Sequence, residues 1–469
     1  MRRTIGFLSG TLLGLAIAVS AQAEVSSAEA AKLGQSLTPF GAEMAGNGKD
    51  VATGLGIPAW TGGLTSDKIP STYTHAGQYH PNPFASDKVL FKINVQNMDK
   101  YADKLTDGVK AMLKTYPDTF HLDVYQSRRS ASAPEFVYKN MKKNATSATL
   151  VHGGNGVQNA FGGMPFPILS GSNENKALQA VWNHILRWRG VYVVRRATEA
   201  PVQADGSYVP ITTQEEVYFR FYDPKYSYKT LNNTIFYYLT FTKSPPRLAG
   251  GAVLVRETLN QDKEPRQAWG YNAGQRRVRR APNIAYDMPI PEADGLRTAD
   301  EVDMYNGSPH KFTWKLLHDQ PVEMFIPYNN YKLNDGKLKY KQILKPGHIA
   351  SDLQRWELHR VWVVQGTLKP DERHIYHKRV FYIDADSWQI AETDEYDSRD
   401  TLWRVGLAYI MNYYEVPTQW SVLDVHHDLR AKRYDVVNLQ NENGFDQDFT
   451  QAIPNARYFS PAALSRRGH

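Results

Sequence analysis

The chain has 469 residues, of which 42% are hydrophobic, 12% aromatic and 22% charged, with a formal net charge of +7. This apolar content and modest charge exclude a wholly disordered chain, and the length suffices for one large domain or for two or three smaller ones. The absence of cysteine excludes disulfides, thiolate metal sites, a cysteine nucleophile and a lipidated N-terminal cysteine.

The first 23 residues have the three parts of a secretory signal peptide. Arg2 and Arg3 form the charged start, residues 5–19 are apolar but interrupted by glycine, and residues 21–23 (Ala-Gln-Ala) fit a small-x-small cleavage site. We therefore expect cleavage after Ala23, which leaves residues 24–469 as the mature periplasmic protein. The rival interpretation is an uncleaved N-terminal anchor. No later stretch approaches about 18 apolar residues, so we expect the mature chain to be soluble and at most peripheral to the outer membrane.

The remaining charge is still basic, because cleavage removes only Arg2 and Arg3. Outside the cytoplasm, a basic surface favours anionic lipid headgroups or acidic proteins as partners over nucleic acid. The densest basic cluster consists of Arg276, Arg277, Arg279 and Arg280. We interpret it as a solvated strand edge that discourages pairing with another sheet.

Three segments in the first 190 residues carry helical signals. Residues 26–33 begin at a serine cap, and residues 97–116 repeat apolar side chains at helical spacing between Asn97 and Pro117. The third helix is expected at about residues 173–188, with Gly190 at the stop position. Gly and Pro are too dense in residues 37–63 for a helix, which predicts an ordered loop.

After Gly190 the apolar period changes from helical to two. Alternation at residues 217–221, 311–316 and 403–413, and strand-like runs elsewhere, predict roughly ten strands at hairpin spacing. Turn signals at residues 272–274, 334–336 and 384–387 separate several of them. The fold class is therefore α+β: a single large domain with a loop-and-helix region at about 24–190 and a sheet region at about 191–469. We expect a large curved antiparallel sheet with one polar and one apolar face that wraps helices.

No motif indicates an enzyme. The chain has no Gly-x-Ser-x-Gly elbow, no His-Glu-x-x-His helix and no Walker-type loop, so we expect no catalytic residue and no cofactor. His374 with His377, and His426 with His427, would point to opposite faces of a strand, which favours structural roles over a metal site. An alternative is a glycoside hydrolase whose carboxylates would come from Asp384, Asp386, Glu392, Asp394 and Glu395. We expect these residues at turns and exposed strand positions instead.

Several motifs resemble a periplasmic family of unknown function whose members are often labelled outer-membrane lipoprotein-sorting proteins. The first motif spans the loop at 37–63 and consists of Leu37, Thr38, Pro39, Gly41, Ala42, Gly46, Asn47, Pro58, Trp60, Gly62 and Gly63. Residues 163–167 with 182–184, and residues 381–388 with 396–397, resemble the family's later motifs. The resemblance implies a fold similar to the LolA/LolB carriers, an unclosed antiparallel barrel over helices around an apolar cavity. It also implies partnership with a resistance-nodulation-division-type exporter and an outer-membrane protein.

The excess of aromatic residues in the sheet region is compatible with a cavity that shields a lipid tail from water. We predict that its wall is formed by Trp269, Phe312, Trp314, Phe381, Trp388, Trp403 and Tyr409. The competing interpretation is that these rings fill a dry core. The sequence thus favours a periplasmic carrier for a lipid, lipoprotein or other hydrophobic molecule. Alternatives are a partner subunit of an envelope complex that carries no ligand, and an envelope glycan or lipid hydrolase.

Overall fold

The computed structural model describes residues 25–281, 286–455 and 457–467. The expected signal peptide therefore lies outside the described residues. Among the residues described, no helix combines the length and the apolar character needed to cross a membrane.

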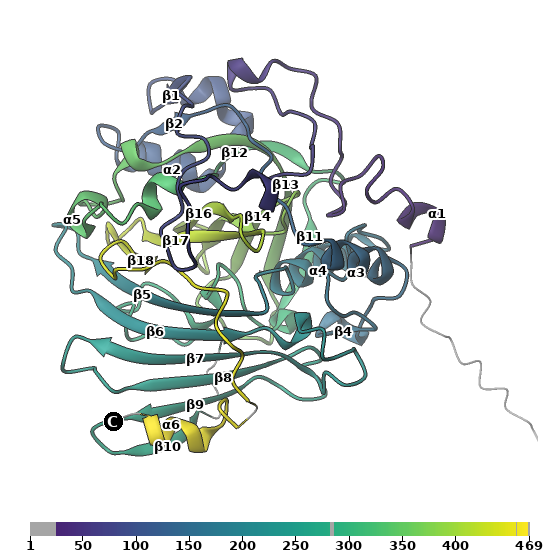
Figure 1. The fold of residues 1–469 in the computed structure, drawn as a ribbon. Helices are drawn as coiled ribbons and strands as arrows, with labels where there is room; N and C mark the ends of the chain where they lie inside the picture. Colours follow the sequence, from purple (N-terminus) through teal and green to yellow (C-terminus); the bar gives the residue numbers. More distant parts are fainter. Residues whose placement is uncertain (1–24, 282–285, 456, 468–469) are drawn as a thin grey trace, which may run out of the picture.

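The longest elements are α4 and β13, each of 13 residues, and the strands and helices before α2 are short (Figure 1). The strands are β1 (Phe91–Ile93), β2 (Leu122–Val124), β3 (Thr149–Leu150), β4 (Val157–Gln158), β5 (Tyr192–Val202), β6 (Ile211–Tyr218), β7 (Thr234–Ser244), β8 (Ala252–Thr258), β9 (Gln267–Asn272), β10 (Arg277–Ala281), β11 (Phe312–Leu316), β12 (Val322–Pro327), β13 (Trp356–Leu368), β14 (Lys378–Asp384), β15 (Ile390–Tyr396), β16 (Leu402–Tyr413), β17 (Thr418–Asp428) and β18 (Arg433–Leu439). The α-helices are α1 (Ser27–Ala30), α2 (Asp107–Thr115), α3 (Glu135–Ala145), α4 (Asn173–Ile185), α5 (Tyr340–Ile343) and α6 (Pro461–Arg467). The 3₁₀ helices are η1 (Val51–Thr53), η2 (Ser66–Lys68), η3 (Met98–Lys104), η4 (His152–Gly154), η5 (Arg220–Tyr222), η6 (Ala299–Glu301), η7 (Pro309–Lys311), η8 (Tyr331–Asn334) and η9 (Ser351–Leu353).

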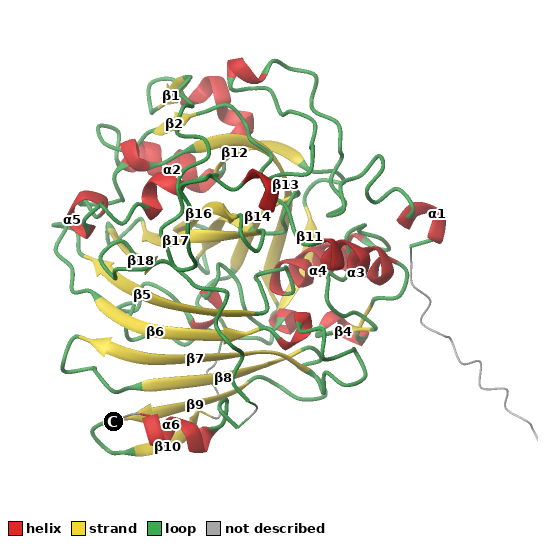
Figure 2. Ribbon diagram, in the orientation of Figure 1, coloured by secondary structure: helices red, strands yellow, loops and turns green. Residues whose placement is uncertain are grey.

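Sixteen strands form one open sheet, and few helices accompany it (Figure 2). Its order is β1-β2-β13-β14-β15-β16-β17-β18-β5-β6-β7-β8-β9-β10. In addition, β12 pairs with the first part of β13 and β11 with its last part. All ladders are antiparallel except the single parallel pairing of Trp356 in β13 with Val124 in β2. In the described part of the chain no ladder joins β10 back to β1, so the predicted unclosed antiparallel sheet is confirmed.

Both faces of the central strands are buried, which corrects the expectation of one polar face. Every residue of β17 is buried, as are ten of the twelve residues of β16. On one face Met304, in the segment 286–311, packs against Gly406. On the other face α2 docks through a hydrogen bond from the Gly108 N–H to Asp394 (2.9 Å). Coverage from both sides removes the solvent that a polar face requires.

The strand pattern is otherwise as predicted at most positions. In β11, Phe312, Trp314 and Leu316 are buried and alternate with exposed Thr313 and Lys315. The turn at 272–274 joins β9 to β10, and the turn at 384–387 joins β14 to β15. One prediction is wrong: β6 ends at Tyr218, so residues 220–222 form η5 instead of continuing the strand. The turn signal at 334–336 is confirmed, because Asn334 ends η8 and residues 336–337 form a turn between β12 and β13.

The helix predicted at 97–116 is broken into η3 and α2. Leu105 and Thr106 are extended, with φ/ψ of −119/135° and −67/161°. The Thr106 hydroxyl accepts the N–H of Val109 (3.1 Å) as the cap of α2 and donates to Glu392 in the sheet (2.8 Å). This tertiary contact has no local signature, which is why the continuous apolar period was misleading.

The other two helix predictions are confirmed with shorter bounds. Ser26 forms a capping box with Glu29 at the start of α1, and Ser172 caps α4, which ends at Ile185 before Gly190 (φ +83°). The helix α3, which begins directly after Pro134, was not predicted from the sequence.

The arginine-rich strand β10 is the last strand of the sheet. Arg277, Arg279 and Arg280 are exposed on it, and α6 packs over β8 to β10 (Figure 1). The interpretation of the cluster as a strand edge is confirmed. Charged side chains at an exposed edge oppose pairing with a second sheet.

Candidate functional site

The N-terminal loop at 37–63 is fixed to the sheet by one buried arginine. Arg129 makes two hydrogen bonds to the carboxylate of Asp386, both 2.7 Å, in the turn between β14 and β15. The same guanidinium donates to the carbonyls of Glu43 (2.8 Å), Met44 (2.9 Å) and Pro58 (3.3 Å). Segments from three distant parts of the chain are thus joined through a single side chain.

The motif residues of this loop serve that docking. A Cβ on Gly41 would lie 1.6 Å from the Pro167 carbonyl oxygen, and one on Gly63 would lie 2.1 Å from that of Ala131. The Trp60 indole N–H donates to the Ala131 carbonyl (2.9 Å). Asn47 accepts the N–H of Ile57 (2.8 Å), which closes the loop on itself. These contacts give four of the motif residues a role in attaching or closing the loop.

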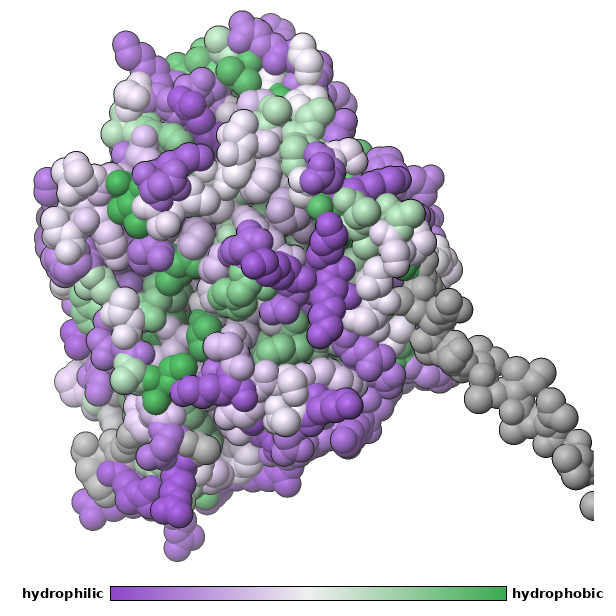
Figure 3. All heavy atoms as spheres, turned by 45° about the vertical axis from the view of Figure 1, so that its right-hand side comes forward, coloured by the Kyte–Doolittle hydropathy of each residue, from purple (hydrophilic) through white to green (hydrophobic). Residues whose placement is uncertain are grey.

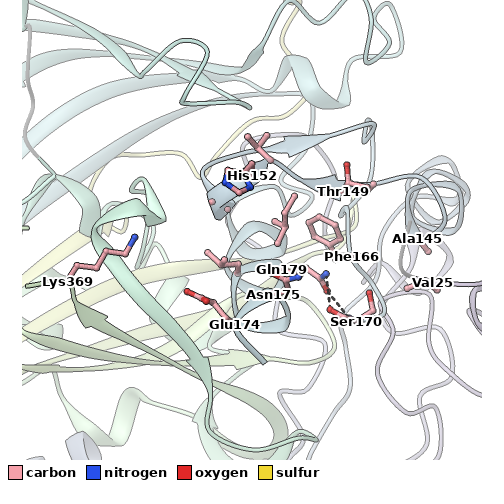
Figure 4. A pocket seen from close by; sticks show the side chains of 16 residues that line it. Val25, Ala145, Thr149, His152, Phe166, Ser170, Glu174, Asn175, Gln179 and Lys369 are labelled. Carbon is pink, nitrogen blue, oxygen red and sulfur yellow. Dashed lines mark hydrogen bonds between the residues drawn. The ribbon is translucent and has the colours of Figure 1, made fainter. Parts of the chain in front are cut away.

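A pocket of about 530 Å³ opens beside the N-terminal half of α4 (Figure 4). Residues from the start of the described chain, the end of α3, the β3–η4 segment, α4 and the loop after β13 line it. The apolar members of its wall are Val25, Ala145, Ala148, Leu150, Val151, Phe166 and Leu178. The polar members include Thr149, His152, Ser170, Glu174, Asn175, Gln179 and Lys369.

The pocket wall mixes polar and apolar side chains, and its charged side chains gather on one side. His152, Glu174 and Lys369 lie on one side in Figure 4, whereas Val25 and Ala145 lie on the opposite side. His152 and Glu174 are exposed, and Phe166 is buried. Ser170 and Gln179 exchange hydrogen bonds of 2.9 and 3.2 Å and stiffen the wall. The Thr149 hydroxyl is buried and has no hydrogen-bond partner among the described residues.

The surface around this region offers little continuous apolar area. On the face shown in Figure 3, hydrophobic residues lie in small groups separated by hydrophilic ones. A smaller pocket of about 340 Å³ lies at the ends of β5 and β6 and is lined by Tyr208, Val209, Arg247 and Asp294, among others. Its wall also carries the charged side chain of Glu292.

The structure brings together three of the seven aromatic residues predicted to line a cavity. Phe312, Trp314 and Phe381 pack on one another with ring centroids 5.8 and 5.9 Å apart, and Tyr305 joins them. All three are at most 2% exposed. Neither of the two pockets described above includes any of the seven in its wall.

The other four lie apart from this group. Trp388 is buried and donates its indole N–H to the Phe40 carbonyl (2.9 Å). Tyr409 is buried in β16, and Trp403 lies half-buried beside the guanidinium of Arg404. Trp269 belongs to a second hydrophobic cluster at the far end of the sheet. Ligand binding by the seven residues stays a prediction.

The five carboxylates considered for glycoside hydrolysis are buried, which corrects their expected exposure. Asp384, Glu392, Asp394 and Glu395 are at most 1% exposed and Asp386 is 5% exposed. Burial raises the pKa of Asp394 to about 7, and burial together with the neighbouring Asp386 raises that of Asp384 to about 6. Carboxylates closed off from solvent in this way have no cleft in which to meet a glycan.

A network of charged side chains fills the face of the sheet that lies opposite to α2. Arg379 joins Asp300 (2.8 Å) to Glu395 (3.0 Å), and His374 lies 3.1 Å from the same Asp300. His426 faces Glu301 at 3.5 Å, whereas His427 faces the Val405 carbonyl at 3.3 Å. The prediction that these adjacent histidines diverge is confirmed. Sequence analysis missed Asp300 and Glu301, whose only signal was their acidity in a segment without periodicity.

Two groups of side chains in the described chain could hold a metal ion. The first, His121, Asp123 and Asp352, is partly exposed, and the Lys92 ammonium lies 3.1 and 3.2 Å from its two carboxylates. That cation already neutralises the group. The second, His359, Asp384 and Asp386, is buried throughout.

Comparisons with known proteins agree with the motifs. An uncharacterized protein of Pseudomonas aeruginosa is 48% identical over 465 residues, which cover 98% of each chain. Similar solved structures are a putative outer membrane lipoprotein-sorting protein domain from Vibrio parahaemolyticus (13% identity, TM-score 0.43) and a DUF1329 family protein from Desulfovibrio piger (12%, 0.42). Each covers 63% of this chain and 100% of its own. A LolA superfamily protein from Nitrosomonas europaea covers 62% of this chain and 98% of its own (10%, 0.36).

Residues 92–465 match the family described as protein of unknown function DUF1329. This match and the close relative confirm the resemblance that the motifs indicated. The chain belongs to the DUF1329 family.

Proposed function

We propose that this protein is a periplasmic binding protein for an amphiphilic, lipid-like molecule, held in the pocket beside α4. The observation that carries the proposal is the mixed wall of that pocket, in which Glu174 and Lys369 lie on one side and Val25 and Ala145 on the other. A volume of about 530 Å³ falls within the range typical of small-molecule sites.

Each end of the pocket suits one part of such a ligand. Leu178, Phe166 and Ala148 would cover an alkyl chain, at roughly 0.8 kcal/mol for each methylene removed from water. Glu174, Lys369 and His152 would meet the headgroup at the mouth, and the unpartnered Thr149 hydroxyl is available to a polar linkage. Both signs of charge at the mouth favour a zwitterionic or hydrogen-bonding headgroup.

Export to the periplasm is part of the proposal and rests on the signal-like first 23 residues. Cleavage after Ala23 would create an α-amino group one residue before Val25, which is part of the pocket wall. As a carrier in the periplasm, the protein would transfer its ligand between a resistance-nodulation-division-type exporter and an outer-membrane protein.

The test is native mass spectrometry of the mature protein purified gently from the periplasm, followed by solvent extraction. A stoichiometric amphiphile that dissociates on extraction supports the proposal. A clean apo mass that does not change after incubation with vesicles of total membrane lipid would contradict it, and would favour a partner subunit that carries no ligand.

Two variants test whether the ligand binds in the pocket beside α4. Ala148→Phe adds a ring to the apolar wall and should weaken binding of a dansylated fatty acid at least 10-fold. Val209→Phe, which changes the smaller pocket at an exposed position, should leave binding unchanged. Equal affinity of the two variants, both folded by circular dichroism, would exclude this pocket.

A further inference from the structure

We propose that His359, Asp384 and Asp386 form a binding site for a divalent transition-metal ion. His359 lies in β13, and the two aspartates end β14 and begin the turn to β15. Their candidate ligand atoms all lie within 4.8 Å of one another, and the three side chains are buried. This site is separate from the proposed amphiphile pocket and does not depend on it.

The hydrogen bonds of His359 orient its free nitrogen toward the aspartates. Its Nε2 lies 3.1 Å from the Glu357 carboxylate, and that carboxylate also accepts the Arg355 guanidinium (2.6 Å) and the Asn329 amide (2.9 Å). A carboxylate acceptor places the ring proton on Nε2 and leaves a lone pair on Nδ1. The arrangement matches the carboxylate–histidine–metal geometry common in metalloproteins.

No hydrogen-bond donor among the described residues lies within reach of the Nδ1 lone pair. Among the described residues Nδ1 makes no hydrogen bond, although His359 is only 1% exposed. The nearest ionisable atom is an Asp384 carboxylate oxygen at 4.0 Å, too far for a hydrogen bond. The Tyr328 ring stacks on the imidazole with centroids 3.8 Å apart and keeps it in this orientation. Two acceptors that face each other across a buried gap call for a cation between them.

Asp384 is the carboxylate of this group that accepts no hydrogen bond from a cation. Its hydrogen-bond donors are the hydroxyls of Tyr328 (3.2 Å) and Ser387 (2.5 Å) and the Asp386 backbone N–H (3.3 Å). Asp386 is paired with Arg129 and Glu357 with Arg355. A buried carboxylate that no cation contacts directly is costly, and a metal ion would reduce that cost.

The ligand set selects the class of metal. One imidazole and two carboxylates suit Zn²⁺ or a neighbouring first-row ion, at about 2.0–2.2 Å from each ligand atom. Ligand atoms of a tetrahedral ion are about 3.4 Å apart, so the His359 and Asp384 atoms, now 4.0 Å apart, would close by about 0.6 Å, and atoms at the 4.8 Å limit by about 1.4 Å. Each Asp386 oxygen keeps a lone pair beyond its bond to Arg129. The bound ion would sit where Arg129 attaches the N-terminal loop, so it would also brace that loop.

The test uses the full mature protein, stripped of metal and titrated with Zn²⁺ by calorimetry, and with Co²⁺ by visible absorption. We expect one equivalent of each ion and a Co²⁺ spectrum with a nitrogen ligand. His359→Gln and Asp384→Asn should each weaken Zn²⁺ binding at least 100-fold and remove the Co²⁺ bands. Asp352→Asn, in the partly exposed group, is the matched control and should keep one high-affinity site.

Unaltered Zn²⁺ affinity in folded Asp384→Asn would overturn the proposal, and so would the absence of any stoichiometric metal in the wild-type protein. ¹⁵N NMR of His359 decides between the metal and its simplest competitor, a second ring proton. An imidazolium signal that does not respond to Zn²⁺ shows that the proton, and not the metal, balances Asp384.

Discussion

Gly63 and Gly48 allow a test of how an added Cβ atom affects the attachment of the N-terminal loop. Both glycines have a left-handed backbone, with φ of +67° and +73°. A Cβ on Gly63 would lie 2.1 Å from the Ala131 carbonyl oxygen, whereas one on Gly48 would meet no atom within 4 Å. An alanine at Gly48 therefore introduces backbone strain alone, whereas one at Gly63 introduces backbone strain and steric overlap.

We expect Gly48→Ala to lower the free energy of unfolding by about 1 kcal/mol, the cost of left-handed backbone for alanine. Gly63→Ala should cost about 1–3 kcal/mol more, because the loop must move away from Ala131. Urea denaturation of both variants measures the difference. Equal losses would mean that the loop does not dock as described.

Asp394 should make the protein less stable as the pH rises. Burial raises its folded-state pKa to about 7, whereas in the unfolded chain it titrates near 4. Between these values the folded state holds a proton that the unfolded state has lost, so stability is greatest below about pH 4 and falls until about pH 7. The slope from this one group is at most about 1.4 kcal/mol per pH unit.

Asp394→Asn removes that titration. Its unfolding free energy should fall less steeply than that of the wild type between pH 4.5 and pH 8, as measured by urea denaturation at several pH values. Parallel profiles would show that Asp394 ionises freely in the folded protein.

At the scale of the element, two helix caps differ in whether they make only local contacts or also a tertiary contact. Ser172 caps α4 by accepting the N–H of Asn175 (3.2 Å) at an exposed position. Thr106 caps α2 in the same way but also donates to buried Glu392 (2.8 Å). The helix start next to the first cap was predicted from the sequence, whereas the second cap fell inside a continuous apolar period that predicted an unbroken helix.

Ser172→Ala should cost about 1 kcal/mol of stability, the ordinary value for a lost cap. Thr106→Ala should cost about 1–3 kcal/mol more, because Glu392 loses its hydrogen-bond donor inside the protein. Thermal unfolding followed by circular dichroism compares the two variants. A loss at Thr106 no larger than that at Ser172 would contradict the role assigned to the contact with Glu392.

At the scale of the molecule, one continuous sheet carries more than one hydrophobic cluster. The main cluster covers β11 to β18 and the helices α2 to α4, and a second one gathers Tyr192, Tyr218, Leu254 and Tyr271 with residues of the C-terminal segment. Phe459 lies at the centre of the second cluster, 5.3 Å from Tyr237 between ring centroids. The end of the sheet near β10 should therefore open more easily than its middle.

Phe459→Ala should cost about 3–5 kcal/mol of local stability and raise hydrogen exchange in β6 to β10 without changing it in β14 to β17. Hydrogen exchange with mass spectrometry resolves the two regions. Phe449→Ala is the control, since Phe449 packs against Tyr413 (5.8 Å) in β16 and should affect the middle of the sheet. A uniform increase over all strands in the Phe459 variant would show that the sheet opens as one unit.

The amino-acid sequence by itself determined the features that depend on near neighbours: the alternation of β11, the cap of α1, the start of α4, the hairpin turns at 272–274 and 384–387, and the charged edge at β10. The family motifs could also be recognised directly. These signals are local, because a residue's backbone preference and the period of apolar side chains act over a few positions.

Only the tertiary structure decided which charged groups are buried and what they meet. Arg129 and Asp386 are 257 positions apart, and Thr106 and Glu392 are 286 apart, so no local pattern could pair them. The same holds for the pocket beside α4 and for the group around His359, whose walls and partners come from several elements. Burial of a carboxylate depends on the cation, hydroxyl or N–H that folding brings to it, and that partner is set by the path of the whole sheet.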